Sequence, residues 1–154
     1  GEVIYRSIVY NEPETPQLLF RFRNRKADGM GDPLPAGKAV LYQMGRYGRT
    51  LIGEATTGDK AVDEDVDLVF AYPDDVTVRT ETPEGQDNKR IVTIRNATPY
   101  PVIYEAEFPT RSYSGYTGLP KGLIRKPGKR VWRTTVPAEG TTVLTYDIVE
   151  TDND

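Results

Sequence analysis

The stretch RIVTIRNATPYPVIYEAEFP (Arg90–Pro109) decides the fold class of this chain. Its two ends are rich in β-branched and aromatic residues, which favour strands. The short segment between them contains Asn96, Thr98, Pro99 and Pro101, and such residues favour turns. A strand, a turn and a second strand in this order predict a β-hairpin, and repeated hairpins are typical of a β-sandwich.

Alternation of apolar and polar residues with period two recurs along most of the chain. The clearest examples are Gln17–Asn24, Lys38–Met44, Val66–Tyr72, Val102–Phe108 and Leu144–Ile148. Turn residues separate these runs at intervals of roughly 8–12 residues, and no window has a helical period. The sequence therefore predicts an all-β fold, a single antiparallel sandwich of about ten strands.

A weak internal repeat adds an open question. The run FRFRN ends at Asn24 and the run VTIRN ends at Asn96. This similarity is explained either by duplicated units or by the general use of asparagine where strands turn.

Composition limits the possible functions. The 154 residues are enough for one domain, the apolar fraction is 37%, and the formal charge is −3. The chain has no cysteine and no histidine, so it lacks disulfides, thiolate metal sites, a cysteine nucleophile and the usual general base of neutral-pH hydrolases. No apolar run approaches the ~20 residues of a membrane span. The mild negative charge also argues against a nucleic-acid partner.

An acidic stretch contains D-x-D-x-D at Asp63, Asp65 and Asp67, which resembles the start of a calcium loop. The pattern fails further along, because Leu68 stands where the loop needs glycine and Asp74 stands where it needs glutamate. We expect the three aspartates to form a solvated strand face, with a weak calcium site as the alternative.

A basic stretch is the best candidate binding surface. Residues 111–133 include seven lysines and arginines, no acidic residue, and interleaved aromatic rings. This combination attracts anionic groups and offers rings for stacking on sugars. The possible ligand surface is Tyr113, Tyr116, Lys121, Arg125, Lys126 and Trp132. The alternative is that these charges only balance the acidic face, within the chain or against a neighbouring domain. We expect the segment Thr110–Lys129 to be a loop or a loose excursion of the chain, because of its glycines and prolines.

Catalytic and nucleotide-binding motifs are poor. GLIRKPGKR (Gly122–Arg130) has the wrong spacing for a P-loop, and Arg130 stands where serine or threonine is needed. Glu105 and Glu107 would lie about 7 Å apart on one strand face, within the spacing of an inverting glycosidase pair. Alternating glutamates are common on exposed strands, so we expect an ordinary exposed face, no catalytic residue, no cofactor and no enzyme activity.

Five segments in order resemble a bacterial family of β-rich domains catalogued as domain of unknown function 4139. They are Leu34–Gln43, Leu51–Asp59, Val66–Glu81, Val92–Pro109 and Val136–Glu150. The resemblance implies an Ig-like sandwich at the C-terminal end of a larger, often exported, bacterial protein. It implies an extracytoplasmic location, periplasmic or at the cell surface, and it transfers no catalytic residue.

These observations give one leading hypothesis and one alternative. We expect residues 1–154 to form a single domain, excised from or C-terminal in a longer protein. Its expected role is that of a non-catalytic structural or protein-interaction domain, whose partner is a neighbouring domain or another protein. The alternative is a carbohydrate- or polyanion-binding module that uses the basic aromatic loop 111–133.

Overall fold

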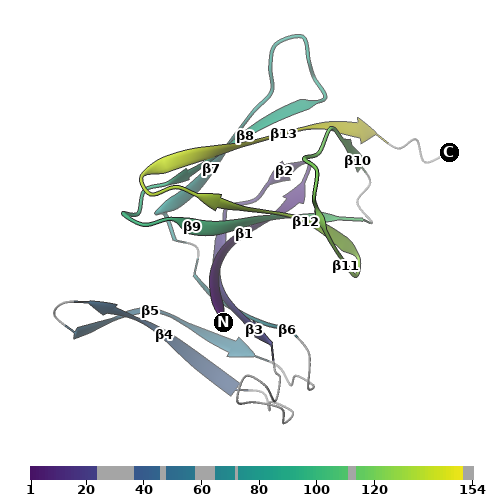
Figure 1. The fold of residues 1–154 in the computed structure, drawn as a ribbon. Coiled ribbons are helices and arrows are strands. Elements are labelled where there is room, and N and C mark those ends of the chain that lie inside the picture. The colour runs from purple at the N-terminus through teal and green to yellow at the C-terminus, as the bar shows by residue number, and fades with distance from the viewer. Residues whose placement is uncertain (24–36, 46–47, 58–64, 72, 111–113, 151–154) are drawn as a thin grey trace. The chain divides into compact units, whose positions relative to one another are not determined.

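The computed structural model describes residues 1–23, 37–45, 48–57, 65–71, 73–110 and 114–150 (Figure 1). Contacts divide the chain into two compact units. The first unit comprises residues 1–4 and 17–72, and the second comprises residues 5–16 and 73–154. Strand β1 contributes residues to both units.

All thirteen elements assigned within the described residues are strands, which confirms the all-β prediction. The strands are β1 (Glu2–Tyr10), β2 (Glu12–Pro13), β3 (Gln17–Arg23), β4 (Gly37–Gly45), β5 (Gly48–Thr57), β6 (Asp65–Ala71), β7 (Val76–Glu81), β8 (Lys89–Asn96), β9 (Val102–Pro109), β10 (Ser114–Thr117), β11 (Ile124–Lys126), β12 (Lys129–Val136) and β13 (Gly140–Glu150). The described residues form more strands than the expected ten. The difference corresponds to β2, β10 and β11, which are too short to show a clear alternation in the sequence.

In the first unit, β3 pairs with β6 and β4 pairs with β5, both antiparallel. The alternation along β3 and β6 sorts their side chains as the sequence predicts. Phe22 and Phe70 pack against the buried Val66 and Leu68 on one face. The opposite face carries arginines and aspartates, which are considered with the candidate sites.

The second unit has two sheets whose inner faces pack against each other. One has the strand order β11-β12-β9-β1, and the other has the order β10-β13-β8-β7. Phe108 of β9 lies 5.5 Å from Tyr146 of β13 and 5.1 Å from Tyr116 of β10, measured between ring centres. These edge-to-face contacts join the two sheets and give the unit a sandwich-like architecture.

The prediction that Arg90–Pro109 forms a hairpin is wrong. Strand β8 pairs with β7 and β13, whereas β9 pairs with β12 in the other sheet. The segment between β8 and β9 therefore carries the chain from one sheet to the other.

The side chain of Asn96 explains this change of sheet. Asn96 is fully buried, and its amide nitrogen donates to the carbonyls of Tyr100, Val136 and Pro137 at 2.8, 3.3 and 3.1 Å. Its oxygen accepts from the backbone N–H and the hydroxyl of Thr98 at 2.9 and 2.6 Å. These bonds tie the turn after β8 to the end of β12, so the chain is directed toward the partner sheet.

Two further expectations need correction. The sheet that contains β1 is mixed, so the predicted antiparallel-only arrangement is wrong. The segment Thr110–Lys129, predicted as a loop, contains β10 and β11. Most glycines and prolines of this segment lie in the turn between β10 and β11 and in the turn that follows β11. The rest of the segment leaves room for two short strands.

Candidate functional site

The sequence RKPGKR forms a hairpin between β11 and β12. Its pairing is symmetrical about a proline–glycine turn, since Lys126 lies opposite Lys129 and Arg125 lies opposite Arg130. Gly128 has a φ of 75°, a conformation that glycine adopts without strain and that a tight turn needs after proline. Directly opposite residues share a face of the sheet, so the two arginines lie on one face and the two lysines on the other.

The two pairs differ in their electrostatic surroundings. Like charges directly opposite each other on paired strands destabilise a sheet. On the lysine face, the ammonium of Lys129 lies 2.9 Å from Oε1 of Glu107, which offsets the repulsion. On the arginine face, neither Arg125 nor Arg130 forms an ion pair with any carboxylate in the described part of the chain.

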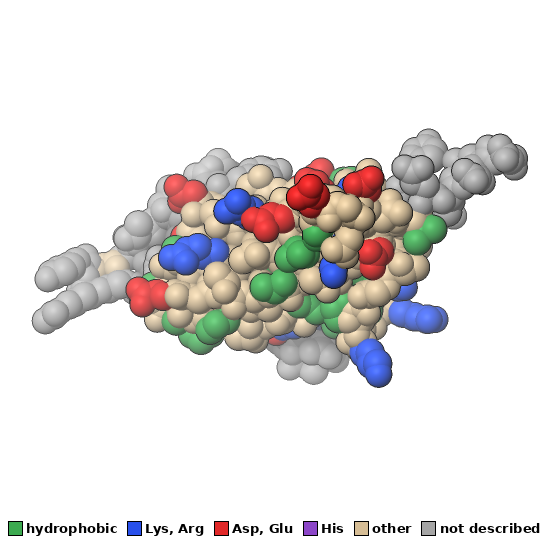
Figure 2. All heavy atoms as spheres, turned by 90° about the horizontal axis from the view of Figure 1, so that it is seen from above, with side chains coloured by type: hydrophobic (Ala, Val, Ile, Leu, Met, Phe, Trp, Pro, Cys, Tyr) green, Lys and Arg blue, Asp and Glu red, His purple; other side chains and the backbone are tan. Residues whose placement is uncertain are grey.

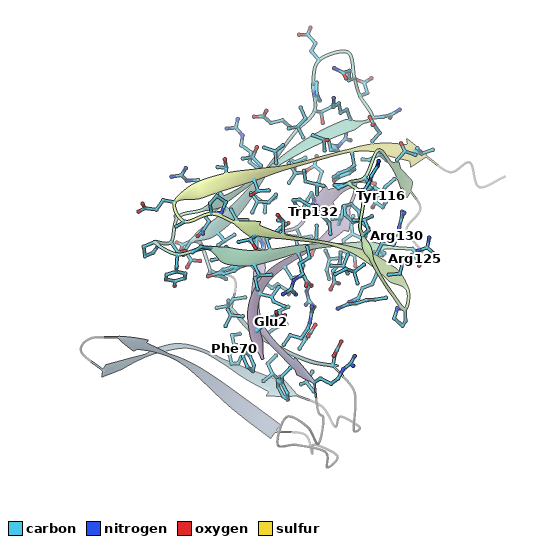
Figure 3. All side chains as sticks on the ribbon, viewed as in Figure 1. Glu2, Phe70, Tyr116, Arg125, Arg130 and Trp132 are labelled. Atoms are coloured by element: carbon cyan, nitrogen blue, oxygen red, sulfur yellow. The ribbon has the colours of Figure 1, made fainter. Side chains whose placement is uncertain are left out.

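The arginine face lines a pocket of about 410 Å³ in the second unit. The lining consists of Tyr116, Lys121, Arg125 and Arg130 together with residues 117–120 and 122–123. None of the described residues that line the pocket is acidic. Figure 3 shows Tyr116, Arg125 and Arg130 close together on β10, β11 and β12. The geometry therefore concentrates three positive charges around a space of small-molecule size.

Tyr116 is the fixed wall of this pocket. Its ring packs edge-on against Phe108 and Tyr146, with ring centres 5.1 and 5.6 Å away. Its hydroxyl donates to the carbonyl of Val9 at 3.3 Å and accepts from the N–H of Asn11 at 3.4 Å. The ring is held by the core, so it shapes the pocket and is not a free platform for stacking.

The other predicted site residues lie elsewhere. Trp132 lies opposite Ala106 and packs edge-on against Tyr104 at 6.2 Å between ring centres, and it does not line the pocket. Lys126 lies on the opposite face of β11. Tyr113 lies outside the described residues. The structure thus brings together Tyr116, Lys121 and Arg125 from the predicted surface.

Arg130 is the cationic pocket residue that the predicted ligand surface omits. The signal that locates it is the palindromic order of RKPGKR around a proline–glycine pair. A two-residue turn at that pair places Arg125 opposite Arg130 by strand pairing alone.

Comparisons of the chain with protein-family models, with curated proteins and with solved structures found no match. The pocket is therefore interpreted from its own chemistry. Among the described residues, no helix has the length and apolar character needed to cross a membrane.

The prediction that Glu105 and Glu107 form an exposed face is wrong. Their exposed fractions are only 1% and 5%. Glu105 Oε2 lies 3.0 Å from Nη1 of Arg133, and Glu107 Oε1 lies 2.9 Å from Nζ of Lys129 and 3.7 Å from Nη1 of Arg6. Long cationic side chains from β12 and β1 cover this face with their hydrocarbon stems while their charged ends pair with the glutamates.

Two of the three aspartates considered for calcium are used in ion pairs of the first unit. Arg21 makes two bonds with Asp67, at 2.8 and 3.2 Å, and Nε of Arg23 lies 3.1 Å from Asp65. Asp63 lies outside the described residues. Within the described ranges, no group of three or more acidic side chains is placed to hold a metal ion.

Three tyrosines of the second unit have raised pKa values. Burial is the main cause for Tyr5, Tyr104 and Tyr146, and the nearby Asp75 carboxylate raises the pKa of Tyr5 further. The hydroxyl of Tyr146 donates to the carbonyl of Asn11 at 2.6 Å, which holds the turn after β1. All three phenols are protonated at neutral pH, and the hydroxyl of Tyr5 donates to Oδ2 of Asp75 at 3.3 Å.

Proposed function

We propose that the chain is a non-catalytic binding module of an exported bacterial protein, and that its pocket binds an anionic ligand. The observation that carries the proposal is the pairing of Arg125 with Arg130 on the pocket face. Lys121 adds a third cation to the same pocket. The proposed function is the carbohydrate- or polyanion-binding role expected as the alternative from the sequence. The residues proposed to carry it are Lys121, Arg125 and Arg130.

The physical argument concerns the cost of the arginine pair. Two guanidinium groups opposite each other repel, and an anion bound between them offsets this repulsion with two attractions. The neighbouring lysine pair gains its compensation from within the protein, through Glu107. The arginine pair has no such carboxylate among the described residues, so its compensation is expected from a ligand.

The proposed Ig-like architecture and exported context rest on the five segments that resemble the bacterial β-rich family. The sandwich-like packing of the second unit supports this view, and so does a chain course that changes sheet between β8 and β9. A binding module of this kind works outside the cytoplasm on surface or matrix polymers, many of which are anionic.

Contact with a neighbouring domain or protein is a second candidate function. The outward face of β13 exposes Val143 and Val149, with exposed fractions of 54% and 43%. Figure 2 shows hydrophobic side chains between acidic and basic ones on one face of the described surface. The two functions are separable, because replacing both valines with glutamate should leave anion binding at the pocket unchanged.

The test of the proposed function is calorimetric titration with a short heparin oligosaccharide as the polyanion probe. Arg125→Glu should weaken binding by about tenfold or more, because it reverses the charge of an exposed side chain that lines the pocket. Lys126→Glu is the matched control, since it makes the same change of charge at the next residue on the opposite face. It should change the affinity by less than about twofold. Equal losses in the two variants would refute the proposal, and so would an absence of saturable binding both to heparin and to small anionic sugars.

A further inference from the structure

We infer that the pocket holds one anionic sugar residue, and does not serve as part of a track for an extended polyanion. This inference rests on the proposed function, because it specifies the ligand of the same pocket. It follows from how the structure distributes the basic residues, from the size of the pocket and from the character of its walls.

The basic stretch does not form one continuous positive surface. Lys121, Arg125 and Arg130 line the pocket. Lys129 and Arg133, which lie on the other face of β12, are engaged by buried glutamates at 2.9 and 3.0 Å. Proteins that bind extended polyanions use a groove of unpaired cations along the polymer backbone. Among the described residues of this stretch, the cations without an ion pair are Lys126 and the three that line the pocket. The three at the pocket suit a ligand with one or two negative charges.

The size of the pocket agrees with a small ligand. Its volume of about 410 Å³ falls near the lower end of the usual range for small-molecule sites, roughly 300–1,000 Å³. The surrounding turn contains glycines with positive φ at Gly118 and Gly122, at 70° and 81°. This conformation lets the backbone curve around the space without bulky side chains.

The walls combine apolar and polar groups. Leu119, Pro120 and Leu123 supply apolar surface beside the cations. Asp147 does not line the pocket, but its carboxylate lies near the lining residue Gly118, where a side-chain carbon would be 3.2 Å from its Oδ2. Apolar C–H faces and hydroxyl donors occur together on sugars, whereas a free inorganic anion has neither. The arginines would bind the acidic group, and the apolar wall would contact the ring.

Two kinds of sugar carry a suitable oxyanion. A uronic acid has a carboxylate, and a sulfate ester has a sulfate; both accept the paired N–H donors of a guanidinium. The shared chemistry is a single oxyanion attached to a sugar ring. The pocket is therefore expected to discriminate strongly against the same sugar without its charge.

The test is a titration of the whole chain at constant ionic strength with four probes: glucuronate, glucose 6-sulfate, glucose and inorganic sulfate. At least one charged sugar should bind about tenfold more tightly than both glucose and sulfate, and the tighter of the two identifies the source of the oxyanion. Arg125→Gln should lower that affinity by about tenfold, and Arg125→Lys by less, because lysine keeps the charge but loses the fork of donors. Lys126→Gln should change it by less than about twofold.

The outcomes separate this inference from the proposed function. Pocket-dependent heparin binding without binding of either charged sugar would overturn the single-residue inference and leave the proposed function standing. Failure of heparin and of both charged sugars would overturn both. Equal affinity for glucose 6-sulfate and inorganic sulfate would show that the site recognises the oxyanion alone, which contradicts a sugar site. Circular dichroism of each variant establishes whether a lost affinity reflects the pocket or the fold. Arg130→Gln is a second variant that removes the other arginine of the pocket.

Discussion

Arg125 and Arg130 lie directly opposite each other on adjacent strands, on the face of the β11–β12 hairpin that lines a pocket. The pair places two positive charges where strand pairing favours opposite charges. Binding function and stability are therefore expected to oppose each other at this position. The arginine pair is expected to lower the free energy of unfolding slightly when the pocket is empty. A bound anion is expected to raise it again.

Removing one arginine should stabilise the empty protein. We expect Arg125→Gln to raise the free energy of unfolding by about 0.2–1 kcal/mol at low salt, because it removes the cross-strand repulsion. Urea unfolding at low and high salt measures this change, and the gain should shrink as salt screens the charges. The control is Lys126→Gln, whose partner Lys129 is already engaged by Glu107. A loss of stability in Arg125→Gln would mean that the arginine pair is compensated within the protein.

Asn96 should be among the most sensitive positions of the second unit. We expect Asn96→Ala to lower the free energy of unfolding by about 3 kcal/mol or more, because several buried donors and acceptors lose their partner together. Thermal or urea unfolding measures the loss. The matched control is Asn88→Ala, in an exposed turn, which should change stability by less than about 0.5 kcal/mol. Similar small effects at both positions would show that the buried bonds of Asn96 do not direct the change of sheet.

Glu105 and Arg133 should behave as a partly buried ion pair, since the glutamate is enclosed and the arginine side chain is 30% exposed. Replacing Glu105 with leucine alone should destabilise the chain by about 1.5–3 kcal/mol, because it removes a charged hydrogen bond to an arginine that is still partly exposed to water. Adding Arg133→Met should recover a large part of this loss, since a well-packed apolar pair is often as stable as a buried ionic one. A double-mutant cycle by urea unfolding measures the coupling. A cost below about 0.5 kcal/mol for the single replacement would contradict the predicted contribution of this ion pair.

The buried tyrosines predict a loss of stability at high pH. A phenol whose pKa is raised in the folded state holds its proton more firmly there than in the unfolded chain. Its contribution is complete below the unfolded pKa of about 10 and declines as pH rises above it, by about 1.4 kcal/mol per pH unit for each such group.

Tyr146→Phe isolates one of these contributions. At pH 8 it should cost about 1 kcal/mol, through loss of the hydrogen bond to the Asn11 carbonyl. Between pH 10 and the folded pKa, the variant should lose less stability with pH than the wild type. Unfolding curves from pH 8 to pH 11 measure both effects, and parallel pH profiles for the two proteins would contradict the prediction.

Local patterns in the sequence were enough to predict the fold class and most strands. The alternation of Phe20 and Phe22 with Arg21 and Arg23, for example, gives both faces of β3 correctly. The same pattern cannot tell which strands pair, because pairing depends on distant residues. The turn after β8 illustrates this limit, since Asn96 is held by carbonyls of Val136 and Pro137, about forty positions away.

The candidate site was predictable in part. Basic composition pointed to Lys121 and Arg125, but composition alone cannot divide a basic stretch between two faces. That division follows from strand pairing, which places Lys129 next to Glu107 and leaves Arg130 facing the pocket. The burial of Glu105 and Glu107 was missed for a related reason, since the side chains that cover them come from other strands.

The central claim is that the pocket formed around Arg125 and Arg130 binds an oxyanion. The most direct measurement is the shift in thermal unfolding temperature when chloride is exchanged for sulfate at constant ionic strength. Comparison with variants removes the general stabilising effect of sulfate, which all forms of the chain share. We predict a larger sulfate shift for the wild type and Lys126→Gln than for the double variant Arg125→Gln/Arg130→Gln, because only the first two keep the anion site. An equal shift in all three proteins would contradict the claim.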